Sequence, residues 1–167
     1  MNAPRALRDR SRHLSAERVS AATYGSVLVL TALPLIRVED VSSGLGWELV
    51  TGIGLATWVA HLFAELLGEE VRHPEPLEAS DVRRAMVDGL PILLAAVLPA
   101  AMLLLGRIGV VDEAPALWMA VIVALVQLFG LGAFVGFARP GVSAWLFALG
   151  TGLVGVIVVV VKLSLSH

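Results

Sequence analysis

Hydrophobic residues in this chain are concentrated in five long runs, and the short segments between them hold most of the charged and turn-forming residues. Each run has roughly the 20 residues that an α-helix needs to cross a hydrocarbon core about 30 Å thick. Strands would leave backbone groups unpaired in lipid unless they closed into a barrel. The pattern therefore predicts an all-α, five-helix membrane bundle, with helices over 19–36, 46–68, 85–106, 116–138 and 143–163.

None of the segments between these runs is long enough to hold a soluble domain. The longest covers 69–84 and joins the second and third predicted helices. We therefore expect one membrane domain over 19–163, preceded by a basic segment over 1–18 and followed by a short tail over 164–167. The basic segment is too long and too rich in arginine for the start of a cleaved signal peptide.

Two serines are candidates for helix N-caps, because a serine hydroxyl can accept a hydrogen bond from a free backbone N–H at a helix start. Ser15 precedes the first predicted helix, and Ser80 precedes an extension of the third.

Composition supports the membrane prediction. Hydrophobic residues make up 57% of the 167 residues and charged residues 16%, whereas soluble domains carry about 25% charged residues. The formal net charge of −2 gives no reason to expect a nucleic-acid partner. The chain has no cysteine, which excludes disulfides, thiolate metal sites and cysteine nucleophiles.

The distribution of basic residues predicts an orientation. With the N-terminus in the cytoplasm, nine basic residues fall inside and three outside, which agrees with the positive-inside rule. Eleven of the twelve basic residues are arginine, which is typical of a GC-rich bacterial coding sequence. We therefore expect a multi-pass protein of a bacterial plasma membrane. The inner residues are Arg5, Arg8, Arg10, Arg12, Arg18, Arg72, Arg83, Arg84 and Arg139, and the outer ones are Arg37, Arg107 and Lys162.

In this orientation, polar side chains from three helices lie at one depth in the cytoplasmic half of the bundle. Polar side chains within a membrane usually face the bundle interior and often mark a functional site. Two arginines lie just beyond them, and one glutamine lies near the middle of the fourth helix. The four candidate site residues are Tyr24, His61, Glu65 and Asp88, with Ser20, Arg18, Arg84 and Gln127 as supporting polar residues.

Each of these residues also has a purely structural interpretation. His61 and Glu65 are four residues apart, so they can pair on one face of a helix near the lipid headgroups. Asp88 can pair in the same way with Arg84. Tyr24 can anchor its helix at the membrane interface, and Gln127 can bridge two helices through a hydrogen bond.

Small residues in the last two predicted helices indicate close packing. Gly132 and Gly136 form a GxxxG pattern, and Gly152 and Gly155 follow small residues at the same spacing in the next helix. Small residues at this spacing let helix backbones approach closely. We expect these two helices to form a tight antiparallel pair.

The sequence offers little support for an enzyme. A histidine and glutamate at this spacing could supply two metal ligands, but the HExxH, GxSxG and glycine-rich phosphate-loop patterns are absent. The paired glutamates in "GEEVRH" lack the arginine that intramembrane CAAX-type proteases place four residues later, because Pro74 stands there. We therefore predict no metal and no cofactor.

Two short stretches resemble a known set of proteins. "ERVSAATYGSVLVL" contains Tyr24-Gly25, and "WVAHLFAELLG" contains His61, Ala64 and Glu65. A Tyr-Gly pair in helix one and a His-x-x-Ala-Glu pattern in helix two are similar to those of small multi-spanning bacterial integral membrane proteins. The resemblance implies a helical membrane fold and carries no activity.

Two functional hypotheses follow. The first is a small conduit or carrier for an ion, proton or solute, in which the polar cluster binds the transported species and the chain oligomerises to form a pathway. Histidine suits such a role because it gains or loses a proton near neutral pH. The alternative is a structural or accessory subunit that docks on a larger membrane complex through the glycine faces of the last two helices. Both place the chain in the lipid bilayer.

Overall fold

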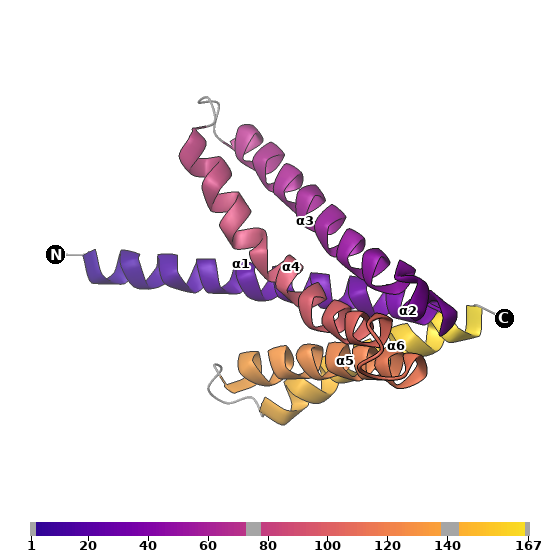
Figure 1. The fold of residues 1–167 in the computed structure, drawn as a ribbon. Coiled ribbons are helices and arrows are strands. Elements are labelled where there is room, and N and C mark those ends of the chain that lie inside the picture. Colours follow the sequence, from indigo (N-terminus) through magenta and orange to yellow (C-terminus); the bar gives the residue numbers. More distant parts are fainter. Residues whose placement is uncertain (1–2, 73–77, 138–143, 166–167) are drawn as a thin grey trace.

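The computed structural model describes residues 3–72, 78–137 and 144–165 (Figure 1). Within these ranges the chain is almost entirely helical and contains no strand, so the all-α prediction is confirmed. The elements are α1 (Ala3–Ala32), the 3₁₀ helix η1 (Leu33–Leu35), α2 (Glu39–Ser43), α3 (Leu45–Arg72), α4 (Ala79–Arg107), α5 (Glu113–Phe137) and α6 (Ala144–Leu165).

Four of these helices are long and apolar enough to cross a membrane. Their candidate spans are Glu17–Leu35, Leu45–Val71, Ala79–Arg107 and Glu113–Phe137. They make the chain a multi-pass membrane protein. In α6 the described apolar stretch, Ala148–Val161, is shorter than these spans. A fifth crossing is therefore part of the proposal made below.

Two helix starts differ from the predictions. α1 begins at Ala3 and passes through Ser15 without a break, so Ser15 is not an N-cap. Most of the basic segment predicted over 1–18 is thus the first part of α1. At α4 the N-cap is Glu78 and not Ser80: the Glu78 side chain accepts a hydrogen bond from the backbone of Asp81, whose side chain accepts one from the backbone N–H of Glu78.

Some of the predicted connecting segments lie outside the described residues. These are the middle of the loop between α3 and α4, the turn between α5 and α6, and the last two residues of the tail over 164–167.

α1 runs through the middle of the molecule (Figure 1). The α3–α4 hairpin lies on one side of it and α5 and α6 lie on the other, and α1 contacts all four helices. At the left of the view, the end of α3 and the start of α4 diverge from α1. We call the end of the bundle that carries Arg18, Arg83 and Arg84 the basic end. The opposite end carries α2 and Arg107.

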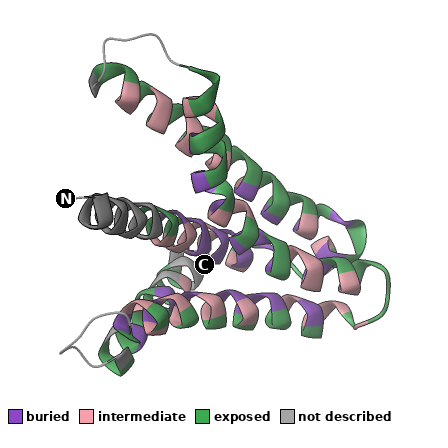
Figure 2. Ribbon diagram, turned by 90° about the vertical axis from the view of Figure 1, so that its left-hand side faces the viewer, coloured by how far each residue is buried: buried purple, intermediate pink, exposed green. Residues whose placement is uncertain are grey.

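The buried core lies between the inward faces of the helices, whereas their outer faces are exposed (Figure 2). Its largest fully buried side chains include Leu30, Leu33, Leu103 and Leu128. Exposed leucine, valine and phenylalanine side chains cover the outside of α3, α4, α5 and α6. An apolar exterior of this extent is what a surface in contact with lipid requires.

Glycines allow α1 and α3 to approach α4 closely. A Cβ atom on Gly25 of α1 would lie 2.9 Å from Cα of Ile92 in α4. A Cβ atom on Gly54 of α3 would lie 2.7 Å from Cβ of Ala96, one turn further along α4. Both distances are shorter than real carbon contacts, so a larger residue at either position would force the helices apart.

The glycines singled out in the sequence lie in α5 and α6. Gly132 and Gly136 are buried residues of α5. A Cβ atom on Gly155 of α6 would lie 3.0 Å from Leu125 and from Leu128 of α5, and one on Gly152 would lie 3.3 Å from Phe129. These glycine faces are therefore occupied within the chain itself.

Candidate functional site

Three of the predicted polar residues line one groove between α1 and α3. Ser20 and Tyr24 contribute from α1 and His61 from α3, around a cavity of about 580 Å³. The remaining lining consists of small side chains, namely Ala21, Ala56, Thr57, Ala60 and Ala64. The tyrosine and serine were predicted to face the bundle interior, yet both are exposed, and Tyr24 is 55% exposed. The groove is therefore open along one side.

The sequence of α3 explains why a groove forms here. Ala56, Ala60 and Ala64 are spaced by four residues, which places them on one face of the helix. Their methyl groups fill little of the space beside α1. Only 11% of the apolar span of α3 is buried, compared with 44% for α4. α3 thus packs mainly on α4 and leaves its side toward α1 partly open.

His61 and Glu65 lie one turn apart on α3 and face each other. Nε2 of His61 is 3.8 Å from Oε2 of Glu65, and each side chain is about one-third exposed. This distance permits electrostatic attraction but is too long for a hydrogen bond. The pair is therefore close enough to exchange a proton through a small rearrangement or a single bridging group.

A glycine on α4 makes room for the ring of His61. A Cβ atom on Gly89 would lie 3.3 Å from Cδ2 of His61 and 3.0 Å from Cδ1 of Trp58. Trp58 also donates a hydrogen bond of 3.3 Å from Nε1 to the backbone carbonyl of Met86. The ring of His61 therefore lies against the backbone of α4, which contributes no side chain to the groove.

Asp88 pairs with a different arginine from the one expected. Its Oδ1 accepts a hydrogen bond of 3.0 Å from Nε of Arg18 on α1. The predicted partner, Arg84 on the same helix, forms no recorded ion pair within the described part of the chain. Asp88 is only 3% exposed, so its carboxylate faces the interior of the bundle. A partner on the neighbouring helix α1 can reach it there. Arg84 is exposed.

The carboxylates of α3 and α4 belong to one electrostatic cluster. Glu65 is near enough to His61, Asp88, Glu17 of α1 and Glu69 for their charges to affect it. Among the described residues, neither Oε2 of Glu65 nor Oδ2 of Asp88 has a hydrogen-bond partner, although both atoms are buried. A buried carboxylate oxygen without a partner is costly. A proton, a cation or a bridging water at either oxygen would supply the missing partner.

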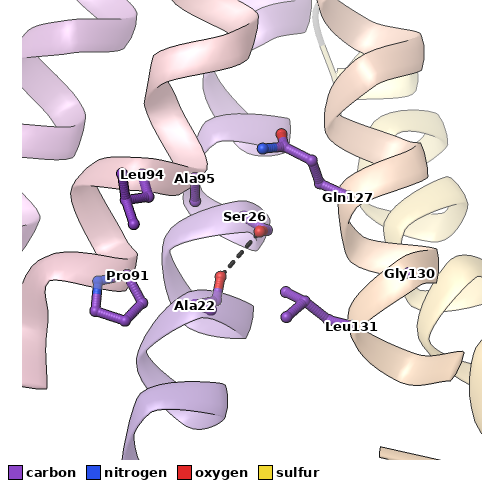
Figure 3. Close-up of a pocket in the computed structure, with 8 residues that line it drawn as sticks. All are labelled: Ala22, Ser26, Pro91, Leu94, Ala95, Gln127, Gly130 and Leu131. Carbon is purple, nitrogen blue, oxygen red and sulfur yellow. Dashed lines mark hydrogen bonds between the residues drawn. The ribbon is translucent and has the colours of Figure 1, made fainter. Parts of the chain in front are cut away.

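Gln127 lies apart from this cluster. It extends from α5 toward α1 and α4, above a second cavity (Figure 3). We expected its amide to bridge two helices. Its Oε1 is buried but accepts no hydrogen bond from the described residues, so the expected bridge is not formed on that side of the amide.

The structure brings together Tyr24, His61, Glu65 and Asp88 with Ser20 and Arg18, and it leaves Arg84 and Gln127 outside this group. Sequence reasoning missed Glu17 and the row of alanines on α3. The alanines had a visible signal in their four-residue spacing. Within the described residues, no group of three or more histidine, aspartate and glutamate side chains is arranged to hold a metal ion.

The conclusions about function rest on this geometry. No protein family model, curated protein or solved structure matches the chain.

Proposed function

We propose that the protein is a small membrane carrier or conduit that moves a proton or a small cation through the groove between α1 and α3. The observation that carries the proposal is the gathering of titratable groups around one groove. His61 and Tyr24 line the groove, and Glu65 lies beside His61. Glu65 and Asp88 each have a buried oxygen that no described residue satisfies.

The balance of charge favours a positive species over an anion. Besides Glu65 itself, the carboxylates of Glu17 and Asp88 lie close enough to affect Glu65 electrostatically. Arg18 neutralises Asp88 through their ion pair, and His61 carries a positive charge only when it is protonated. In a medium of low dielectric constant, uncompensated carboxylates attract protons and cations strongly and repel anions.

The open side of the groove suggests how a pathway is completed. A polar path through a membrane has to be shielded from lipid, and the groove is bounded by only two helices. A second copy of the chain placed against α1 and α3 supplies the missing wall. We therefore propose a homo-oligomer in which the groove is closed at the interface between copies.

The proposed topology has five crossings with the N-terminus in the cytoplasm of a bacterial cell. The excess of arginine at the basic end supports this orientation. The helical extent of α6, Ala144–Leu165, supports the fifth crossing, because about 20 helical residues span the hydrocarbon core.

Flux measurements in proteoliposomes test the proposal. The purified protein is reconstituted, and proton movement is followed with a pH-sensitive dye under imposed potassium, sodium and chloride gradients. We expect proton or cation flux that falls at least tenfold in His61→Ala and in Glu65→Gln. Thr51→Ala, an exposed polar position on the same helix, is the matched control and retains wild-type flux.

Two results contradict the proposal. One is a reconstituted protein that moves neither protons nor the tested ions. The other is flux that His61→Ala and Glu65→Gln leave unchanged, because the pathway then lies elsewhere.

The alternative of an accessory subunit now has a weaker basis. Its proposed docking surface was formed by the glycines of α5 and α6, and Gly132, Gly136 and Gly155 pack inside this chain. An accessory role would have to use another surface, such as the poorly buried α3. Cross-linking that recovers a stoichiometric foreign membrane protein supports it, whereas recovery of this chain alone supports the homo-oligomer.

A further inference from the structure

A second crevice lies between α1 and α4, on the other side of α1 from the groove. It contains two cavities. The one at the basic end has a volume of about 350 Å³ and is lined by Arg18, Ser80, Arg83, Arg84, Val87 and Asp88. The other has a volume of about 380 Å³ and lies between α1, α4 and α5 (Figure 3). The transport proposal places its pathway in neither cavity, although Arg18 and Asp88 of its charged cluster line the first.

The two cavities follow each other along the same helix faces. Arg18 lines the first, and Ala22 and Ser26 line the second, at four-residue intervals on α1. On α4, Asp88 lines the first and Pro91 lines the second. At a rise of 1.5 Å per residue, about 12 Å separates the Arg18 level from the Ser26 level. The crevice therefore has a charged end and an inner apolar part at successive depths.

The cavity at the basic end carries a positive charge. Three arginines and one aspartate line it, which gives a formal charge of 3 − 1 = +2. Arg18 uses Nε to bind Asp88, and its two terminal nitrogens remain available. Arg83 and Arg84 are exposed, and neither has an ion pair recorded with the described residues. Arginines grouped in this way bind phosphate groups through paired, charge-assisted hydrogen bonds.

The inner cavity is apolar and opens on the membrane-facing surface. Its lining is dominated by carbon atoms, and the hydroxyl of Ser26 is already used in a hydrogen bond to the Ala22 carbonyl (Figure 3). Leu94 and Gly130 line it and are exposed, so its mouth faces lipid. The amide of Gln127 bounds the cavity with a polar group, which limits how far an apolar chain extends along it.

We propose that this crevice holds one anionic phospholipid, with its phosphate at Arg83 and Arg84 and one acyl chain in the cavity beneath Gln127. A charged site at the basic end and an apolar cavity deeper in the membrane match the two parts of such a molecule. Basic pockets between membrane helices bind anionic lipid headgroups for the same reason. A soluble phosphate matches the first cavity alone.

The proposal is tested by lipid binding to the purified full-length chain in a neutral detergent. Native mass spectrometry counts lipids retained from mixtures of phosphatidylglycerol and phosphatidylcholine, and a titration with phosphatidylglycerol gives its dissociation constant. We expect one phosphatidylglycerol per chain in preference to phosphatidylcholine. In the double variant Arg83→Gln/Arg84→Gln we expect the dissociation constant to rise at least tenfold. Arg37→Gln, an exposed arginine at the opposite end, is the matched control and leaves it unchanged.

A separate variant tests whether an acyl chain occupies the inner cavity. Nothing lies within 4 Å of a Cβ atom on Gly130, so Gly130→Leu starts from open space at the cavity mouth and narrows it. It should weaken phosphatidylglycerol at least fivefold and leave the binding of soluble glycerol phosphate unchanged. Equal retention of the two lipids, wild-type binding by the double arginine variant, or glycerol phosphate that binds as tightly as the lipid overturns the proposal. The lipid-binding test does not measure proton flux. A failure of the lipid proposal can therefore be distinguished from a failure of the transport proposal.

Discussion

Asp88 of α4 accepts a hydrogen bond of 3.0 Å from Nε of Arg18 of α1, across 70 positions of sequence. The two ends of this bond differ in exposure, because the Asp88 side chain is 4% exposed and the Arg18 side chain is 50% exposed. The arginine can turn toward water or lipid headgroups when its partner is removed. The aspartate cannot, so the energetic cost of breaking the pair depends on which residue is changed.

Removal of Arg18 should destabilise the protein more than removal of the charge on Asp88. We expect Arg18→Gln to lower the free energy of unfolding by about 1–3 kcal/mol, which is below the range for a fully buried pair because Arg18 is half exposed. Asp88→Asn should cost less, and the double variant should be more stable than Arg18→Gln alone. Denaturant titration in mixed micelles measures all three. Purely additive effects would show that the two residues do not interact.

Replacement of Gly25 should separate α1 from α4. Gly25→Ala places a methyl group 2.9 Å from Cα of Ile92, and we expect a loss of about 1–3 kcal/mol from overpacking. Gly52→Ala is the matched control, because a Cβ atom on Gly52 meets nothing within 4 Å. The control should be neutral or stabilising by up to about 1 kcal/mol, since alanine favours helix more than glycine does. Melting temperatures that fall equally in both variants argue against the close contact.

A large side chain in the groove should block transport. Ala60 lines the groove, whereas its neighbour Val59 is exposed and does not. We expect Ala60→Phe to reduce flux in proteoliposomes at least tenfold and Val59→Phe to leave it near the wild-type rate. The two variants add an aromatic ring at almost the same depth, so lipid perturbation is matched. Normal flux through Ala60→Phe would place the pathway outside the groove.

Cysteine labelling should distinguish the groove from the lipid-facing surface. The chain has no native cysteine, so a single introduced thiol reacts without background. We expect Ala56→Cys, in the groove, to react with a charged, water-soluble methanethiosulfonate at least ten times faster than Leu55→Cys, which is exposed outside the groove. Equal rates at the two positions are inconsistent with a water-filled groove.

At the opposite end, Arg107 should matter more than Arg37. The guanidinium of Arg107 lies 5.8 Å from the centre of the Trp47 ring and 3.7 Å from Glu48. It also lies in the last turn of α4, where a positive charge is favourable. We expect Arg107→Ala to cost about 1–2 kcal/mol. Arg37→Ala removes only an exposed pair with Glu39 and should change the unfolding free energy by less than about 0.5 kcal/mol.

The pattern of apolar runs predicted the helical class and located every long helix, because burial in lipid imposes the same requirement on all of them. It missed the start of α1 at Ala3. The segment before Glu17 is rich in arginine, so its mean hydropathy is low, although alanine, leucine and arginine favour helix there. The Glu78–Asp81 capping pair sets the start of α4 through local hydrogen bonds. Hydropathy does not predict helix starts of this kind either.

For the candidate site, the level of each residue along the bundle was predictable from the sequence. The neighbouring helix that supplies its partner was not. Helix direction and a fixed rise per residue placed Tyr24, His61 and Asp88 at one level. The choice of Arg18 over Arg84 as the partner of Asp88 depends on how α1 lies against α4, and a spacing of four residues on one helix says nothing about a neighbouring helix. Gly25 was visible in the Tyr24-Gly25 pair, but neither Gly25 nor Gly54 stands in a repeated small-residue motif, so their packing role was not predicted.

Gly25 and Gly54 have one more consequence when they are taken together. They allow α1 and α3 to lie against adjacent turns of α4, at Ile92 and Ala96. From there the helices diverge toward the basic end (Figure 1). The three helices are therefore held together at Ile92 and Ala96, and the groove beside His61 lies on the side of this crossing where they separate.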